Sequence, residues 1–162
     1  MKDREFAPFL GLPELRPGRF EMAVVQQPGV ADTFRTRGWL VKDAAVVSAQ
    51  VDRYRDYITS SWGEFTVARD HYVRPRTDWF SDRSACYLAA GRPVITQETG
   101  FSDVLPTGRG LFAVTSVEEA IAAMDAIDSD PADHQEAARD IAAEYFDATV
   151  VVGDLLERAG LT

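Results

Sequence analysis

Cysteine, histidine and long apolar runs are scarce in this chain of 162 residues, which argues against disulfides, zinc sites and membrane-spanning helices. The single cysteine, Cys86, cannot form a disulfide within the chain, and with only two histidines it leaves too few ligands for a zinc site. No stretch approaches the roughly 18 consecutive apolar residues that a membrane-spanning helix needs. The N-terminal residues are charged and interrupted by prolines, unlike a signal peptide. We therefore expect a cytoplasmic protein with no membrane span and no bound metal.

Basic residues are also in the minority. The chain has 17 Lys and Arg against 26 Asp and Glu, which gives a formal net charge of −9. Nucleic acids and anionic membranes repel such a chain, so neither is an expected partner. The segment 69–83 is the exception, because it gathers four arginines within fifteen residues. It is the part of the sequence that could form a local basic patch.

The order of apolar segments predicts an α/β fold. Length and an apolar fraction of 46% suit one domain, which we place at 20–162, after an irregular lead-in over 1–19 that prolines and glycines interrupt. Short apolar runs then alternate with helical patterns, and strands are expected at 20–25, 39–43, 64–68, 93–96 and 110–114. Such alternation is typical of βαβ units. It predicts a Rossmann-like three-layer α/β/α sandwich around one mainly parallel sheet.

Caps and glycines mark the expected helices. Ser81 or Asp82 can cap a helix that Gly91 closes, and Ser116 with Glu119 forms a capping box. The first expected helix follows a turn at 26–29 and ends near 37–38. Further helices are expected to begin at 51, 117 and 131, and two others to span 82–90 and about 149–159. A long loop is expected over 69–81.

The start of the helix near Ser81 could bind an anion. Free N–H groups and the helix dipole attract phosphate, and segment 77–84 adds the hydroxyls of Ser81 and Ser84 and the charges of Arg76 and Arg83. In the simpler interpretation, Ser81 or its neighbour only caps the helix, and the arginines pair with surplus acids. The residues alone favour that simpler interpretation.

The loop QETG at 97–100 is the second candidate. Gly100 permits a positive φ and a close approach of ligand to backbone, while Glu98 and Thr99 could reach hydroxyl groups. A plain surface turn explains the same residues equally well. Arg69 follows the third strand and would face the same crevice, since ligands bind beyond the carboxyl ends of parallel strands. Neither histidine has a partner spaced for a nucleophilic triad, so the catalytic residue is unknown.

Several of these motifs resemble those of one enzyme family. AAGRPVITQETGFSDVLPTGRGLFAV followed by SVEEAIAAMDAI resembles the C-terminal domain of GT-B glycosyltransferases of the group 1 type, and AARDIAAEYFDATVVVGDLLERAG is similar to their closing helices. The resemblance runs from about Glu64 to the C-terminus. EFTVARDHYVRPRTDWFSDRSACYLAAGRPV also resembles an actinobacterial-type branch of such proteins.

The resemblance implies a site for a nucleotide-sugar donor, UDP- or TDP-linked, with no cofactor and no metal ion. The diphosphate would lie at the helix after Ser81, and the sugar near Gln97 to Gly100. Arg69 and Arg76 would stabilise the charge that develops on the leaving nucleotide. The implied donor-binding residues are Arg69, Arg76, Thr77, Ser81, Arg83, Ser84, Gln97, Glu98, Thr99 and Gly100.

The resemblance also implies a second half. A GT-B enzyme has two Rossmann-like domains, and this chain is long enough for one of them. An N-terminal acceptor-binding domain or a partner chain would complete the cleft, and the chain alone would bind donor without transferring sugar. The alternative is a non-catalytic Rossmann-like interaction or regulatory module. Cys86 favours this alternative, because many relatives have a ribose-binding glutamate at that position.

Overall fold

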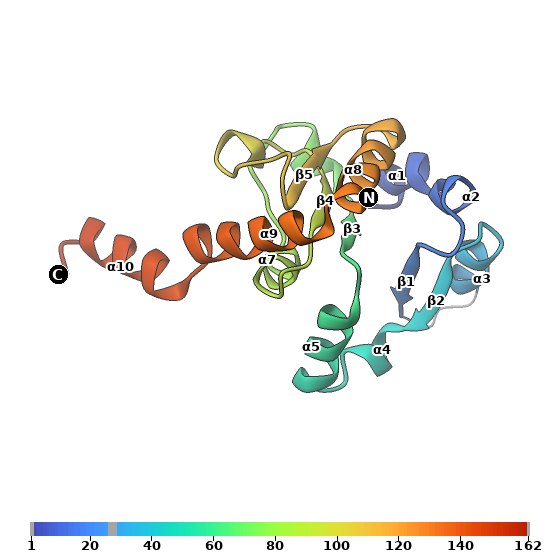
Figure 1. Cartoon of the computed structure of the whole chain (residues 1–162), viewed down its shortest axis with the longest axis horizontal. Helices are drawn as coiled ribbons and strands as arrows, with labels where there is room; N and C mark the ends of the chain where they lie inside the picture. Colours follow the sequence, from blue (N-terminus) through green and yellow to red (C-terminus); the bar gives the residue numbers. More distant parts are fainter. Residues whose placement is uncertain (1, 26–28, 162) are drawn as a thin grey trace.

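A computed structural model of the chain describes residues 2–25 and 29–161, and it shows a mixed α/β architecture with parallel sheets (Figure 1). Strands β3 (Glu64–Thr66), β4 (Val94–Gln97) and β5 (Leu111–Val114) form a three-stranded sheet in the order β3-β4-β5. Strands β1 (Glu21–Val24) and β2 (Leu40–Asp43) pair with each other in a separate parallel sheet. The α/β class and the five strands are therefore confirmed.

The expectation of one continuous sheet is wrong. Aromatic side chains rather than backbone hydrogen bonds join the two sheets: the ring of Phe20, just before β1, lies 5.1 Å from Trp39 and 6.1 Å from Phe65 on β3, centroid to centroid. Phe20 and Trp39 are buried, whereas none of the four residues of β1 is. The buried part of this contact is thus made by Phe20 and Trp39, which precede the strands, and Met22 of β1 and Val41 of β2 pack against the same core while only partly buried.

The lead-in is helical rather than irregular. Residues 2–15 form α1 (Lys2–Phe6), the 3-10 turn η1 (Ala7–Phe9) and α2 (Leu12–Leu15). Pro8 and Pro13 lie in the first turns of η1 and α2, where a missing N–H breaks no hydrogen bond. Phe9 and Leu12 are almost fully buried in the same core cluster as β4 and β5 residues.

Most other helices lie where the caps and periodicity place them. The side chains of Ser116, Asp130 and Asp147 accept hydrogen bonds from backbone N–H groups at the starts of α8, α9 and α10. Two single turns, α4 and α6, were not anticipated, and the expected turn over 26–28 lies outside the described residues. The helices are α3 (Val30–Arg35), α4 (Ala44–Val47), α5 (Val51–Ser60), α6 (Asp70–Val73), α7 (Asp82–Ala89), α8 (Val117–Ser129), α9 (Pro131–Tyr145) and α10 (Ala148–Arg158).

Helices cover both faces of the three-stranded sheet. Val94 and Leu111 pack on one face with residues of α7 and α9, while Ile95 and Val114 pack on the other with α8 and the lead-in. This alternation is the period of two that a buried strand imposes. Helix α10 projects away from this body and buries none of its residues (Figure 1). In the described part of the chain, no helix is both long and apolar enough to cross a membrane.

Two neighbouring glycines before β5 provide a test of this packing. Both have positive φ, +95° at Gly108 and +75° at Gly110. A Cβ at Gly108 would meet nothing within 4 Å, whereas one at Gly110 would lie 2.5 Å from Ala138 N in the backbone of α9. We expect Gly108→Ala to lower the free energy of unfolding by ~1 kcal/mol through backbone strain alone. Gly110→Ala should lower it by ~3 kcal/mol or more, because the helix must also move.

Urea denaturation of the two variants and of the wild-type chain measures this difference. Equal losses for Gly108→Ala and Gly110→Ala would contradict the close packing of α9 against the start of β5.

Candidate functional site

A pocket of about 290 Å³ lies beyond the carboxyl end of β3. Its walls come from the residues after β3, from α6, from the loop that follows α6, and from the start of α7. This edge of a parallel sheet is where α/β proteins bind ligands. We call it the β3 pocket, and its lining residues are Val67, Ala68, Arg69, Tyr72, Trp79, Ser81 and Arg83.

Arg83 is bound to β3 by a buried carboxylate. Its Nε donates a hydrogen bond to Oε1 of Glu64, and its Nη2 donates one to Thr66 Oγ1 at 2.8 Å. The hydroxyl of Ser84 donates to the other Glu64 oxygen at 2.6 Å. Burial lowers the pKa of Arg83, but the charge and hydrogen bond of Glu64, together with Tyr54 and Tyr87, raise it above its usual value. The guanidinium therefore stays charged at the pocket.

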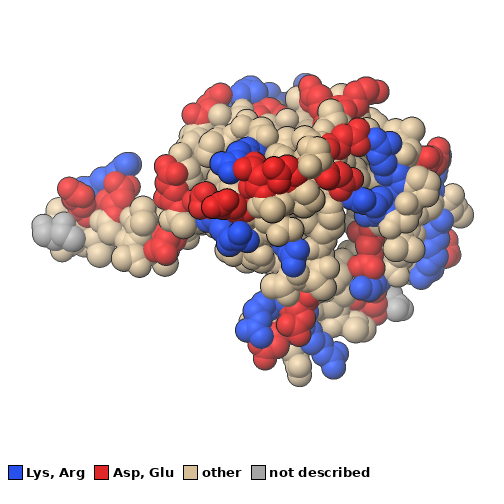
Figure 2. All heavy atoms as spheres, viewed as in Figure 1, with Lys and Arg blue, Asp and Glu red and all other residues tan. Residues whose placement is uncertain are grey.

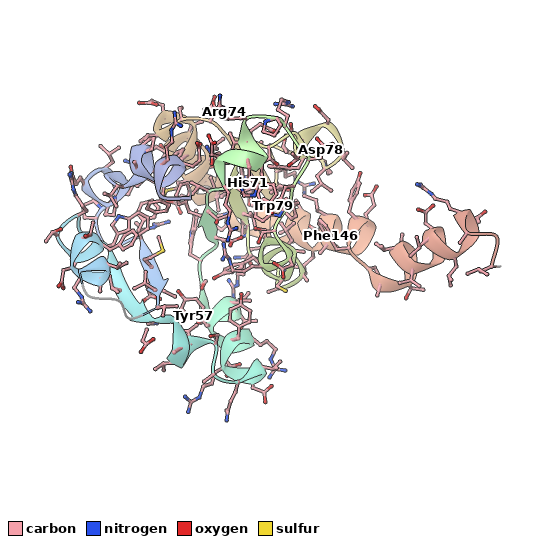
Figure 3. All side chains as sticks on the ribbon, turned by 180° about the vertical axis from the view of Figure 1, so that it is seen from behind. Tyr57, His71, Arg74, Asp78, Trp79 and Phe146 are labelled. Carbon is pink, nitrogen blue, oxygen red and sulfur yellow. The ribbon has the colours of Figure 1, made fainter. Side chains whose placement is uncertain are left out.

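Further basic side chains lie on the segment that carries the pocket. Arg69 occupies the N-cap position of α6 and is exposed, as are His71 and Arg74. Among the described residues, none of these three side chains forms an ion pair with an acidic group. Figure 3 shows His71 beside Trp79, whereas Arg74 lies farther away, at the upper edge of the molecule in this view.

Acidic side chains gather over α8 and α9 on the face opposite to that of Figure 3, as Figure 2 shows. Arg69 and Arg83 are the charged residues of the pocket lining, and Glu64 balances the charge of Arg83.

Two stacked rings form one wall of the β3 pocket. Tyr72 and Trp79 are parallel within 2°, with centroids 4.8 Å apart, and His71 lies against Tyr72 at 4.1 Å. We call Tyr72 and Trp79 the aromatic pair. An aromatic face beside the exposed Arg69 suits a ligand that combines a planar ring with negative charge.

The loop that carries Trp79 is bound to the loop after β4. The N–H of Asp78 donates to Thr99 O at 2.9 Å, and the Thr99 hydroxyl donates to Trp79 O at 2.6 Å. Asp78 and Arg76 both have positive φ, +59° and +50°. The positive φ predicted for Gly100 is confirmed at +106°, but the carboxylate of Asp78 packs where its Cβ would be. Gly100 therefore allows two loops to approach each other.

The structure brings three of the predicted donor-binding residues together in the β3 pocket: Arg69, Ser81 and Arg83. Ser81 is buried and occupies the N-cap position of α7, yet its side chain makes no capping hydrogen bond. Asp82 instead accepts from the N–H of Arg83 at 2.8 Å. The helix begins where the sequence predicts, but the predicted side-chain cap is wrong, because Ser81 makes no capping hydrogen bond and Asp82 is already the first helical residue. The serine hydroxyl lies in the pocket lining instead.

Other predicted residues have partners inside the protein. The Ser84 side chain points under β3 to Glu64, so it does not line the pocket. Gln97 is buried, with its Oε1 accepting from Ala68 N at 3.2 Å and its Nε2 donating to Glu5 at 2.8 Å. Thr99 is almost fully buried.

The remaining predicted residues lie on the loop surface. Arg76 is within 3.7 Å of Glu98 and 3.3 Å of Asp103, so it pairs with acids as the simpler interpretation anticipates. Glu98 also accepts from the N–H of Gly100, and Thr77 is exposed. None of these residues lines the β3 pocket.

Sequence reasoning missed Tyr72, Glu64 and Thr66 as parts of the site. Tyr72 lies in α6, a single turn inside the expected loop, and its contact with Trp79 spans an irregular segment that has no periodicity. Glu64 and Thr66 carry a detectable signal, since polar residues two apart on a buried strand imply a polar partner on the covering helix.

Comparison with known proteins adds no assignment, because no family model, curated protein or solved structure matches the chain. Within the described residues, no three side chains of His, Cys, Asp or Glu gather in a way that could hold a metal ion.

Proposed function

We propose that this chain is the donor-binding half of a metal-independent GT-B glycosyltransferase, and that it holds a UDP- or TDP-linked sugar in the β3 pocket. One observation carries the proposal. The pocket beyond a parallel strand combines two arginines with the aromatic pair, which matches the two ends of a nucleoside diphosphate.

The phosphate end of the ligand belongs beside Arg69, Ser81 and Arg83. Arg69 is an exposed cation, and Ser81 supplies a hydroxyl that caps no helix. Because Asp82 already accepts from the Arg83 N–H, we assign the diphosphate to these side chains more than to the helix amides. Both guanidinium groups would stabilise the charge that develops on the leaving nucleotide, which is the largest catalytic contribution available without a metal.

The base end of the ligand belongs against the aromatic pair. Tyr72 and Trp79 both line the pocket and stack on each other, so a planar base could stack on an outer face of the pair while its phosphates reach the arginines. The sugar contacts expected at Gln97 and Thr99 would require those side chains to exchange internal partners for sugar hydroxyls. We therefore place recognition mainly in the nucleoside diphosphate. An acceptor-binding domain or partner chain would supply the acceptor contacts.

A second candidate function is a non-catalytic interaction module. Helix α10 favours it, because its apolar residues Val151, Val152, Leu155 and Leu156 are all exposed. Such a stripe is typical of a helix that packs on another protein surface. Absence of thermal stabilisation by every nucleotide of a test panel would favour this candidate over donor binding.

The charge of Arg69 provides the first test of donor binding. We expect Arg69→Gln to weaken UDP binding about tenfold, since one charge-assisted hydrogen bond to phosphate is lost. Arg74→Gln is the matched control, because it removes the same charge from an exposed neighbour outside the pocket lining. Its effect should stay within about twofold at 0.15 M salt.

Isothermal titration calorimetry with UDP measures these affinities. Equal effects of Arg69→Gln and Arg74→Gln would place the phosphate outside the β3 pocket. No heat from wild-type protein at millimolar UDP would overturn the proposed function itself.

The aromatic pair provides the second test. Tyr72→Leu keeps apolar bulk but removes the ring that stacks on Trp79. We expect it to weaken UDP about fivefold or more, because stacking of a base on an aromatic side chain contributes about 1–3 kcal/mol. Binding of inorganic pyrophosphate, which has no ring, should change little. A parallel loss of both ligands would show that Tyr72 only shapes the pocket.

A further inference from the structure

A cluster of four polar side chains lies between β3 and α7, behind the β3 pocket. Glu64 and Thr66 are two residues apart on the strand, so they face the same helix, which presents Arg83 and Ser84. Glu64, Thr66 and Ser84 are buried, and Ser84 is completely so. Arg83 alone extends from this cluster to the pocket, and its side chain keeps 40% of its exposure.

The geometry of the guanidinium determines what Arg83 can do there. The group is planar, with five N–H bonds arranged as a fixed fork. Its Nε and Nη2 donate to Glu64 and Thr66, so one side of the fork is bound to β3. Among the described residues, none accepts a hydrogen bond from Nη1. The terminal edge of the fork, formed by Nη1 and the second N–H of Nη2, therefore remains for another acceptor.

We propose that Glu64 and Thr66 are positioning residues, which fix Arg83 so that the terminal edge of its guanidinium binds a phosphate of the ligand in two parallel hydrogen bonds. The inference rests on the proposed function, since it assigns an orientation to one of the phosphate-binding side chains. Two hydrogen bonds from β3 hold a long, flexible side chain in one orientation before the ligand arrives. Glu64 balances the positive charge of Arg83 while it holds the side chain in place.

Two substitutions remove the orientation without changing the formal charge. Thr66→Val replaces the hydroxyl that accepts from Nη2 by a methyl group of the same shape. Glu64→Asp keeps the carboxylate, but its side chain is shorter by one methylene. We therefore expect the carboxylate to lose contact with Arg83, Ser84 or both. Thr96→Val is the matched control, because Thr96 is the buried residue paired with Thr66 on β4 and does not contact Arg83 through a hydrogen bond.

The experiment measures calorimetric affinity for UDP and for inorganic pyrophosphate together with the NMR signal of the Arg83 Nε–H. We expect Thr66→Val and Glu64→Asp to weaken both ligands about tenfold, as loss of a fixed bidentate contact should. Thr96→Val should stay within about twofold of wild type. The Nε–H of Arg83 should exchange slowly with solvent in the wild-type protein and faster in both positioning variants.

Different failures have different meanings. If wild-type protein binds neither UDP nor pyrophosphate, the proposed function falls, and this inference with it. If the wild type binds both ligands and the two variants bind them equally well per folded molecule, with only a lower melting temperature, Glu64 and Thr66 are structural and the inference alone is overturned. Should Glu64→Asp fail to fold, the isosteric Thr66→Val variant still decides between these outcomes.

Discussion

The ion pair between Glu64 and Arg83 is the interaction on which this site depends. A carboxylate at 6% exposure needs a partner, because a buried unpaired charge is strongly destabilising. Arg83 and Ser84 satisfy its two oxygens and so attach the first turn of α7 to β3. That attachment sets where the start of α7 lies relative to the end of the strand. The β3 pocket lies between these two ends, and Tyr72 of α6 and Trp79 form one of its walls.

The packed sheet and the loop after β4 support the walls of the β3 pocket. Apolar residues cover both faces of the three-stranded sheet, with α7 and α9 on one and α8 with the lead-in on the other. Hydrogen bonds through Thr99 tie the loop of Trp79 to the end of β4. The pocket therefore has walls from three successive chain segments, each anchored to the same sheet. A preformed site of this kind needs little reorganisation to bind a ligand.

Local sequence signals predicted the elements well. Apolar runs located all five strands, and the caps at Ser116 and Asp130 located α8 and α9, because strand period and helix capping depend on neighbouring residues. The division into two sheets could not be predicted in this way. It depends on which strands pair, and strands that pair can be far apart along the chain. The contacts of Phe20 with Trp39 and Phe65, which join the two sheets, also link distant residues.

The site was predicted in part for the same reason. Arg69, Ser81 and Arg83 follow from position, since they lie at the end of a strand and the start of a helix. Ser84 looked equivalent to Ser81, but the packing of α7 on Glu64 turned it inward. Gln97 was expected to face a ligand, and Glu5, 92 residues away, is its partner instead. Tyr72 escaped notice because a single helical turn leaves no periodic pattern.

The central claim is that a nucleoside diphosphate binds in the β3 pocket, and mapping of backbone amide shifts during an NMR titration with UDP tests it most directly. The account predicts that the largest shifts fall between Val67 and Arg83, with smaller ones at Gln97 to Gly100. Saturable shifts confined to another face of the molecule, or none at millimolar UDP, would contradict it.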